Sequence, residues 1–244
     1  MSAQELKLRE KRLLKALSES IARRDRLEAD KDRLQRKKTH GIDLARINED
    51  IRDVNRELRK VRANIHKRRK WLKRIHRAIK RAMRPKVIDL KLDFRPMTPQ
   101  GGVSRVIGHY TAGPRDEDTK DAIRLCRIYH QAHLNNGWSG EGYHICFTSD
   151  GDILVLRPAH WVGAHTLGYN TGSYGVMCHG TTGDTPTRAQ KRAMRWWAKN
   201  GHKSRMGAGR TNVKPGDLPW GVHKDFNPTS CPGSFEAAYR SKGK

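Results

Sequence analysis

The chain has 244 residues and a formal net charge of +26, from 51 lysines and arginines against 25 aspartates and glutamates. This length suits one ordinary domain with an extended part, and the charge favours polyanionic partners such as nucleic acid, an anionic membrane surface or bacterial envelope polymers. No stretch approaches the roughly 20 apolar residues of a membrane-crossing helix, and the four cysteines lack the close spacing of a disulfide scaffold.

The amino-terminal part of the chain carries helical patterns. Residues 3–38 contain neither proline nor glycine and place leucines at near-heptad spacing, which predicts one helix. A second and more regular seam follows, in which steps of three and four alternate through Leu44, Ile47, Ile51, Val54, Leu58, Val61, Ile65, Leu72, Ile75 and Ile79. A repeat of this kind is typical of a coiled coil, in which a narrow apolar stripe is buried against a partner helix.

The segment KKTHGID separates the two helical patterns. Gly41 permits a reversal of the chain, and Asp43 is a suitable cap for the second helix. We therefore expect residues 1–84 to form a basic coiled-coil helical hairpin, and self-association through the same seam is a further option. The amino terminus has no unbroken apolar run of a secretory signal, so synthesis in the cytoplasm is expected.

Prolines and glycines interrupt the heptad pattern after Pro85, and we expect a linker at residues 85–101. Beyond it, residues 102–244 read as one mixed α/β domain. The alternation in VSRVIGHY predicts a strand with His109 at its end, and residues 116–136 predict a helix. A strand hairpin is expected around Asp150 and Gly151, a further strand at residues 173–180, and a helix at residues 186–201.

Three side chains stand out as candidate metal ligands. His223 and Cys231 lie eight residues apart in a loop rich in proline, glycine and aspartate, and His109 lies at a strand end. Zinc hydrolases use three protein ligands of this kind and keep a fourth position for water. Cys126, Cys146 and Cys178 lie on predicted helix or strand faces, so we expect them to be buried core residues.

Four segments resemble type 2 N-acetylmuramoyl-L-alanine amidases and peptidoglycan-recognition proteins, in the order in which that family carries them. They are GHYTAG at 108–113, GWSGEGYHICFTSDGDILVLRP at 137–158, GAHTLGYNTGSYGV at 163–176 and GVHKDFNPTSCPG at 221–233. The resemblance spans nearly all of residues 101–240 and excludes the amino-terminal hairpin. It implies a mixed sheet flanked by helices.

The resemblance also implies roles for single residues. His109, His223 and Cys231 would bind Zn2+, and Tyr143 would hydrogen-bond the attacked carbonyl or the attacking water. Thr229 stands where amidase-type phage lysozymes carry lysine and where catalytic peptidoglycan-recognition proteins carry threonine, so it would stabilise the oxyanion only as a neutral donor. His165, Asn170 and Trp138, together with Trp161, would line the substrate groove.

The function implied is zinc-dependent hydrolysis of the amide between the lactyl group of muramic acid and L-alanine in bacterial peptidoglycan. Because relatives without catalysis replace the ligand cysteine, Cys231 favours an enzyme over a peptidoglycan receptor that binds without cutting. The long basic hairpin disfavours a third reading, a cytoplasmic amidase that recycles wall fragments. A phage endolysin that is made in the host cytoplasm and reaches the wall through a holin pore fits best.

The basic hairpin has three candidate roles. The first is a solvated spacer or oligomerisation stalk, and the second is binding of anionic wall polymers through cations such as those of residues 67–84. Nucleic-acid binding ranks third because residues 1–84 show no zinc finger, no aromatic stacking pattern and no basic region followed by a zipper.

Overall fold

The computed structural model describes residues 2–38, 43–201 and 214–243. The chain divides into two compact units, residues 1–84 and residues 85–244. Neither long helix of the first unit, nor any other helix in the described ranges, combines the length and apolar character that a membrane crossing requires.

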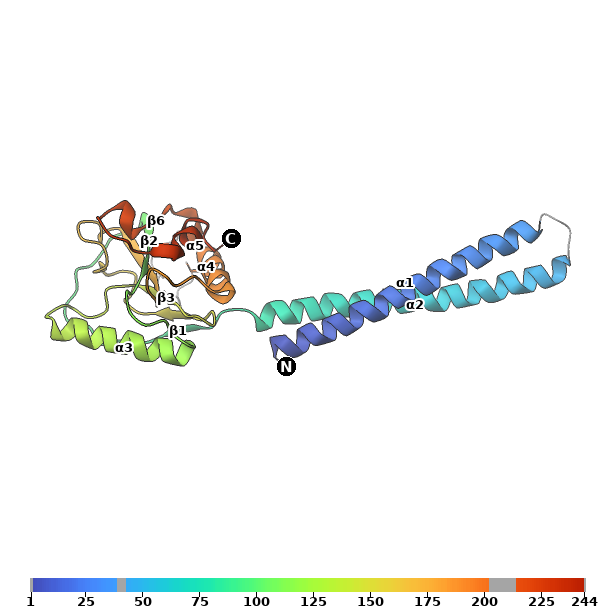
Figure 1. Ribbon diagram of the computed structural model, residues 1–244, viewed down its shortest axis with the longest axis horizontal. Helices are drawn as coiled ribbons and strands as arrows, with labels where there is room; N and C mark the ends of the chain where they lie inside the picture. The colour runs from blue at the N-terminus through green and yellow to red at the C-terminus, as the bar shows by residue number, and fades with distance from the viewer. Residues whose placement is uncertain (1, 39–42, 202–213, 244) are drawn as a thin grey trace. The chain divides into compact units, whose positions relative to one another are not determined.

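The first unit is a helical hairpin, as expected. Helices α1 (Ala3–Lys38) and α2 (Leu44–Ala82) lie side by side along their lengths (Figure 1). Glu10 pairs with His76, and Arg23 pairs with Glu57. Later residues of α1 therefore lie beside earlier residues of α2, so the two helices are antiparallel. The buried apolar residues of α2 all belong to the predicted seam, and they are Ile47, Leu58, Val61 and Ile65.

The connection between the two helices is described only in part. Asp43 caps α2 as expected, because its side chain accepts a hydrogen bond from the Arg46 amide at 3.2 Å. The reversal predicted at Gly41 lies outside the described residues.

The second unit is built on a six-stranded sheet, counted over the described ranges, in the order β1-β4-β3-β5-β2-β6. Its strands are β1 (Val87–Asp89), β2 (Arg105–Tyr110), β3 (Ile145–Phe147), β4 (Ile153–Val155), β5 (Ser173–Cys178) and β6 (Trp220–Val222). The neighbours β3, β5, β2 and β6 are mutually parallel, and β4 is antiparallel to β3. The carboxyl ends of these four parallel strands therefore lie at one edge, where side chains for chemistry can gather.

Helices cover both faces of the sheet (Figure 1). Helix α3 (Thr119–Asn135) packs on one face, and α4 (Arg188–Asn200) with α5 (Glu236–Arg240) packs on the other. Alternation along β3 shows the two sides, because Ile145 and Phe147 face α4 while Cys146 between them faces α3. The second unit is thus the mixed α/β arrangement that the sequence predicts.

Local chemistry explains most element boundaries. Helix α3 begins later than expected because Asp118 caps it, accepting from the Asp121 amide at 2.8 Å. Helix α4 begins at a capping box formed by Thr187 and Gln190. Strand β1 lies inside residues 85–101, the stretch expected to be a linker, and pairs in parallel with β4. A strand of three residues among prolines gives too short an alternation to be recognised before its partner is known.

Candidate metal centre

His109 and His223 are neighbours because of the register between two parallel strands. Gly108 of β2 pairs with Val222, the last residue of β6. The next residues, His109 in β2 and His223 directly after β6, therefore reach the same edge of the sheet on the same face. Their ring centroids lie 4.7 Å apart. A β-carbon at Gly108 would lie 2.4 Å from the Tyr239 ring, so this close packing of β2 on α5 requires glycine there.

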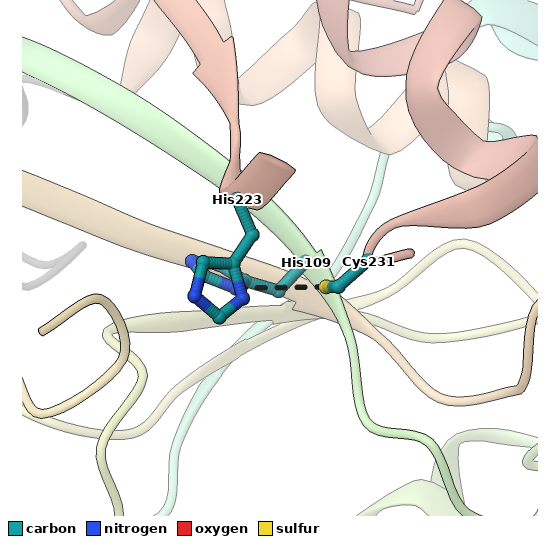
Figure 2. A group of neighbouring side chains, drawn as sticks. All are labelled: His109, His223 and Cys231. Carbon is teal, nitrogen blue, oxygen red and sulfur yellow. Dashed lines mark hydrogen bonds between the residues drawn. The ribbon is translucent and has the colours of Figure 1, made fainter. Parts of the chain in front are cut away.

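Cys231 joins the two histidines through a closed loop. The Lys224 amide donates to the Cys231 carbonyl at 3.0 Å, which returns the chain to the strand end after a short 3-10 turn, His223–Asp225. The Cys231 Sγ accepts from the Tyr110 amide at 3.3 Å and lies 3.8 Å from His109 Nδ1. Figure 2 shows the three side chains converging, and their ligand atoms all lie within 4.8 Å of one another.

The protonation chemistry of these three side chains fits zinc. Burial, and then the neighbouring His223, holds the pKa of His109 well below its ordinary value, and burial also lowers the pKa of His223. Both imidazoles are therefore neutral, which is the form that binds metal. Burial raises the pKa of Cys231 to about 11, against the opposing effect of the Tyr110 amide. A bound cation would displace that thiol proton, as in other two-nitrogen, one-sulfur zinc sites.

His165 lies behind His109 and is enclosed by protein. It is 7% exposed, and its Nδ1 lies 3.1 Å from His109 Nε2, on the side of the His109 ring away from Cys231. Its Nε2 lies 3.2 Å from the Ser173 hydroxyl. Asn170 holds this loop, because its Oδ1 accepts from the amides of His165 and Thr166, both at 2.8 Å.

His165 and Asn170 both contact protein groups, and their place in a substrate groove stays a prediction. Both ring nitrogens of His165 contact protein partners, and the Asn170 carbonyl oxygen is used within its own loop. A short polar motif such as GAHTLGYN does not reveal which way its histidine faces, and here the ring turns inward to support His109.

Tyr143 and Thr229 lie beside the three candidate ligands in different ways. The Tyr143 ring centroid is 5.1 Å from that of His109, and burial raises the pKa of its phenol, so the hydroxyl keeps its proton. The Thr229 hydroxyl accepts from the Cys231 amide at 3.2 Å. Because it accepts there, its own proton can still be donated elsewhere.

Trp138 and Trp161 differ in their exposure to solvent. Trp138 is 48% exposed and stacks on His133, with ring centroids 4.8 Å apart. Trp161 is half-buried, forms an isolated bridge with Pro99, and accepts from His144 through its carbonyl at 3.0 Å. Trp138 is thus open to solvent, whereas Trp161 is tied into the loop structure.

The structure adds one residue at this centre that the sequence did not suggest. The Tyr239 hydroxyl donates to the His109 carbonyl at 2.7 Å, and the whole side chain is buried. It comes from α5, near the end of the chain, where no motif pointed to a role. A buried tyrosine that must find a polar partner was the one available signal.

Comparison with known proteins identifies the family of the second unit. The family model for N-acetylmuramoyl-L-alanine amidase matches residues 99–234. A human protein named N-acetylmuramoyl-L-alanine amidase is 36% identical over 118 residues, which are 46% of this chain and 18% of that protein. The endolysin of Klebsiella phage KP32 is 39% identical over 54 residues, which are 22% of this chain and 36% of that protein.

A solved structure of Drosophila peptidoglycan-recognition protein LB has the same fold, with a TM-score of 0.53 and 23% identity over 62% of this chain and 89% of that one. Because the family model covers more than half of the chain, the chain belongs to the N-acetylmuramoyl-L-alanine amidase family. It spans about a fifth of the length of the human relative and about a third of the phage one.

Proposed function

We propose that this protein is a zinc-dependent N-acetylmuramoyl-L-alanine amidase, which hydrolyses the amide between the lactyl group of muramic acid and L-alanine in bacterial peptidoglycan. The observation that carries the proposal is the convergence of His109, His223 and Cys231, with ligand atoms within 4.8 Å of one another, in a chain of this family. Two neutral imidazoles and one sulfur form a donor set that zinc prefers, and they leave a position for water.

The three ligands would hold the ion in a defined place. When bound, zinc supplies a Lewis acid that polarises the amide carbonyl and lowers the pKa of water toward neutrality. Contact with His165 fixes the His109 ring, and the hydrogen bond from the Tyr110 amide fixes the Cys231 sulfur. Such outer contacts orient ligands and tune the affinity for the metal.

Tyr143 and Thr229 would act on the amide oxygen as negative charge develops there. The raised pKa of Tyr143 keeps its hydroxyl a donor over the working pH range. Thr229 can donate while its oxygen accepts from the Cys231 amide. Both are neutral donors. The metal would therefore supply more of the oxyanion stabilisation here than in an enzyme with a lysine at position 229.

His165 and Asn170 become positioning residues in this proposal, because their contacts point to His109 and to the loop that supports it. Trp138 is retained as a candidate contact for the glycan or the stem peptide, since its ring is exposed and held flat against His133.

Three variants test the proposal. Replacing His223 or Cys231 with alanine should abolish both zinc binding and hydrolysis, because each change leaves two ligands. Tyr143→Phe should keep zinc and lower turnover by about 10²- to 10³-fold, the usual effect of removing one oxyanion donor. Metal content and release of stem peptides are measured on the same samples. A His223→Ala enzyme with full activity and no zinc would contradict the mechanism.

We further propose that the enzyme acts as a phage endolysin, supported by its similarity to the endolysin of Klebsiella phage KP32. The alternative is a peptidoglycan receptor without catalysis, and the presence of Cys231 beside both histidines argues against it. Expression together with a holin should lyse a bacterial host, and expression of Cys231→Ala with the same holin should not.

A further inference from the structure

A second group of metal-binding side chains lies in the layer between the sheet and α3. Cys126 from α3, Cys146 from β3 and His179, directly after β5, place their ligand atoms within 4.8 Å of one another. All three side chains are fully buried, with 0% exposure. None belongs to the candidate zinc centre, and of the three only Cys146 lies within a segment of the family resemblance, the one at 137–158.

Strand register explains how these residues meet. Cys146 of β3 pairs with Met177 of β5, and both side chains face α3. His179 lies two residues beyond Met177, so the alternation of the strand directs it to the same face. Cys126 reaches this place from the buried stripe of α3, one turn after Ala122.

The spacing of the donor atoms suits a metal ion. Cys126 Sγ lies 3.4 Å from His179 Nε2. In a tetrahedral site with metal–sulfur bonds of about 2.3 Å and metal–nitrogen bonds of about 2.0 Å, sulfur and nitrogen are separated by about 3.5 Å and two sulfurs by about 3.8 Å. Small side-chain rotations are therefore enough to bring all three donors to one ion.

Charge and hydrogen bonding favour the same conclusion. Two thiolates and a neutral imidazole would neutralise a divalent cation, which makes its burial in an apolar layer acceptable. Burial raises the pKa of Cys126, but interactions with Cys146 and His179 outweigh it and lower that pKa overall. Tyr129 Oη, Glu141 Oε2 and His179 Nδ1 are also buried with no hydrogen-bond partner among the described residues.

We propose that Cys126, Cys146 and His179 form a second, structural site for a thiophilic metal ion such as zinc, which fastens α3 to the sheet. Close packing of small apolar side chains accounts for two buried cysteines. It does not account for a histidine with no exposed surface whose Nε2 faces a thiol and whose Nδ1 is unpaired in the described part of the chain. A metal ion would give this buried imidazole a bonding partner.

Cobalt titration of the metal-free full-length protein tests this site, because thiolate-to-cobalt absorption counts the bound sulfurs. The wild type should take up two equivalents and show three thiolates. The double variant Cys126→Ala/Cys146→Ala should take up one equivalent with one thiolate. Cys178→Ala is the matched control, since Cys178 is equally buried but lies outside both ligand groups, and it should behave as the wild type.

A reciprocal variant keeps the test decisive if the double cysteine variant does not fold. His223→Ala/Cys231→Ala should bind one equivalent with two thiolates, and zinc should raise its melting temperature. Uptake of no thiolate-bound cobalt by this variant, or identical titrations for the wild type and Cys126→Ala/Cys146→Ala, would overturn the second site. If the wild type binds a single equivalent of cobalt through two thiolates, the second site is supported and the proposed catalytic centre is contradicted.

Discussion

His165 contacts a candidate ligand, His109, through its ring. Its Nδ1 lies 3.1 Å from His109 Nε2, and the Thr166 hydroxyl lies 3.3 Å from that same nitrogen. We predict that His165→Ala weakens zinc binding by about 10- to 100-fold, the usual cost of losing such an outer contact. Competition with a chelator measures the affinity, and His160→Ala, an exposed histidine, is the control.

Kinetics at saturating zinc distinguish this role from substrate binding. A positioning role leaves KM for peptidoglycan fragments near the wild-type value once the metal is restored. A large rise in KM with normal zinc affinity would show instead that His165 binds the substrate.

Glu141 makes stability depend on pH. Burial, and then the nearby Cys126, raises the pKa of its carboxyl to about 8, whereas an unfolded chain ionises it near its ordinary value of 4.5. Between these values the folded state holds the extra proton, so stability should fall as pH rises from about 4.5 to about 8, by an amount on the order of 5 kcal/mol. Glu141→Gln should remove this loss.

Urea unfolding of the metal-free wild type and metal-free Glu141→Gln at pH 5 and pH 8 measures this effect. Glutamine can still accept from the Gly142 amide, which Glu141 binds at 2.9 Å. The stability advantage of the variant should grow with pH. Parallel pH profiles would show that Glu141 ionises in the folded protein as it does in water.

The packing of β2 on α5 depends on glycine at position 108. Gly108→Ala would place a β-carbon 2.4 Å from the Tyr239 ring, whose hydroxyl holds the His109 carbonyl at 2.7 Å. We predict a loss of about 1–3 kcal/mol in the free energy of unfolding, as for other overpacked cores, together with weaker zinc binding. Gly102→Ala meets nothing within 4 Å and should change neither. Equal stability of the two variants would show that α5 moves aside freely.

Some elements could be predicted from the sequence because their signal is local. The seam through Ile47, Leu58 and Val61 repeats over many turns, and the Asp150–Gly151 dipeptide marks its own hairpin. Strands β1 and β6, of three residues each, escape such reasoning because only pairing with β4 and β2 defines them. Short strands depend on partners that lie far away in the sequence.

The two candidate metal sites differ in how much of each can be predicted from the sequence. Loop composition and a family resemblance both single out His109, His223 and Cys231 as candidate ligands. The structure adds the physical cause for the two histidines, which is the Gly108–Val222 register. The sequence predicts that Cys126 and Cys146 are buried, and the structure confirms it. Their neighbour His179 is not predicted. His179 lies inside the strand predicted at residues 173–180, two residues after Met177, and that alternation is the available signal.

At the scale of the whole molecule, the two units allow separate tests of wall targeting and catalysis. Residues 1–85 hold 29 lysines and arginines against 12 aspartates and glutamates. We predict that a chain of residues 85–244 still digests soluble fragments but sediments less with purified walls, and that salt weakens the binding of the full chain. The full chain with Lys67→Gln, Lys70→Gln and Lys73→Gln, all exposed, should bind at an intermediate level. Equal sedimentation of long and short chains would refute the targeting role of the hairpin.

The central claim is that this chain cuts one particular bond with the help of zinc. The most direct test is to digest purified peptidoglycan with the full-length protein, with and without a chelator, and to identify the products by mass spectrometry. Free stem peptides that begin at L-alanine should appear, disappear on chelation and return when zinc is added. Intact peptidoglycan that the protein binds tightly, or cleavage at a glycosidic bond, would contradict the account.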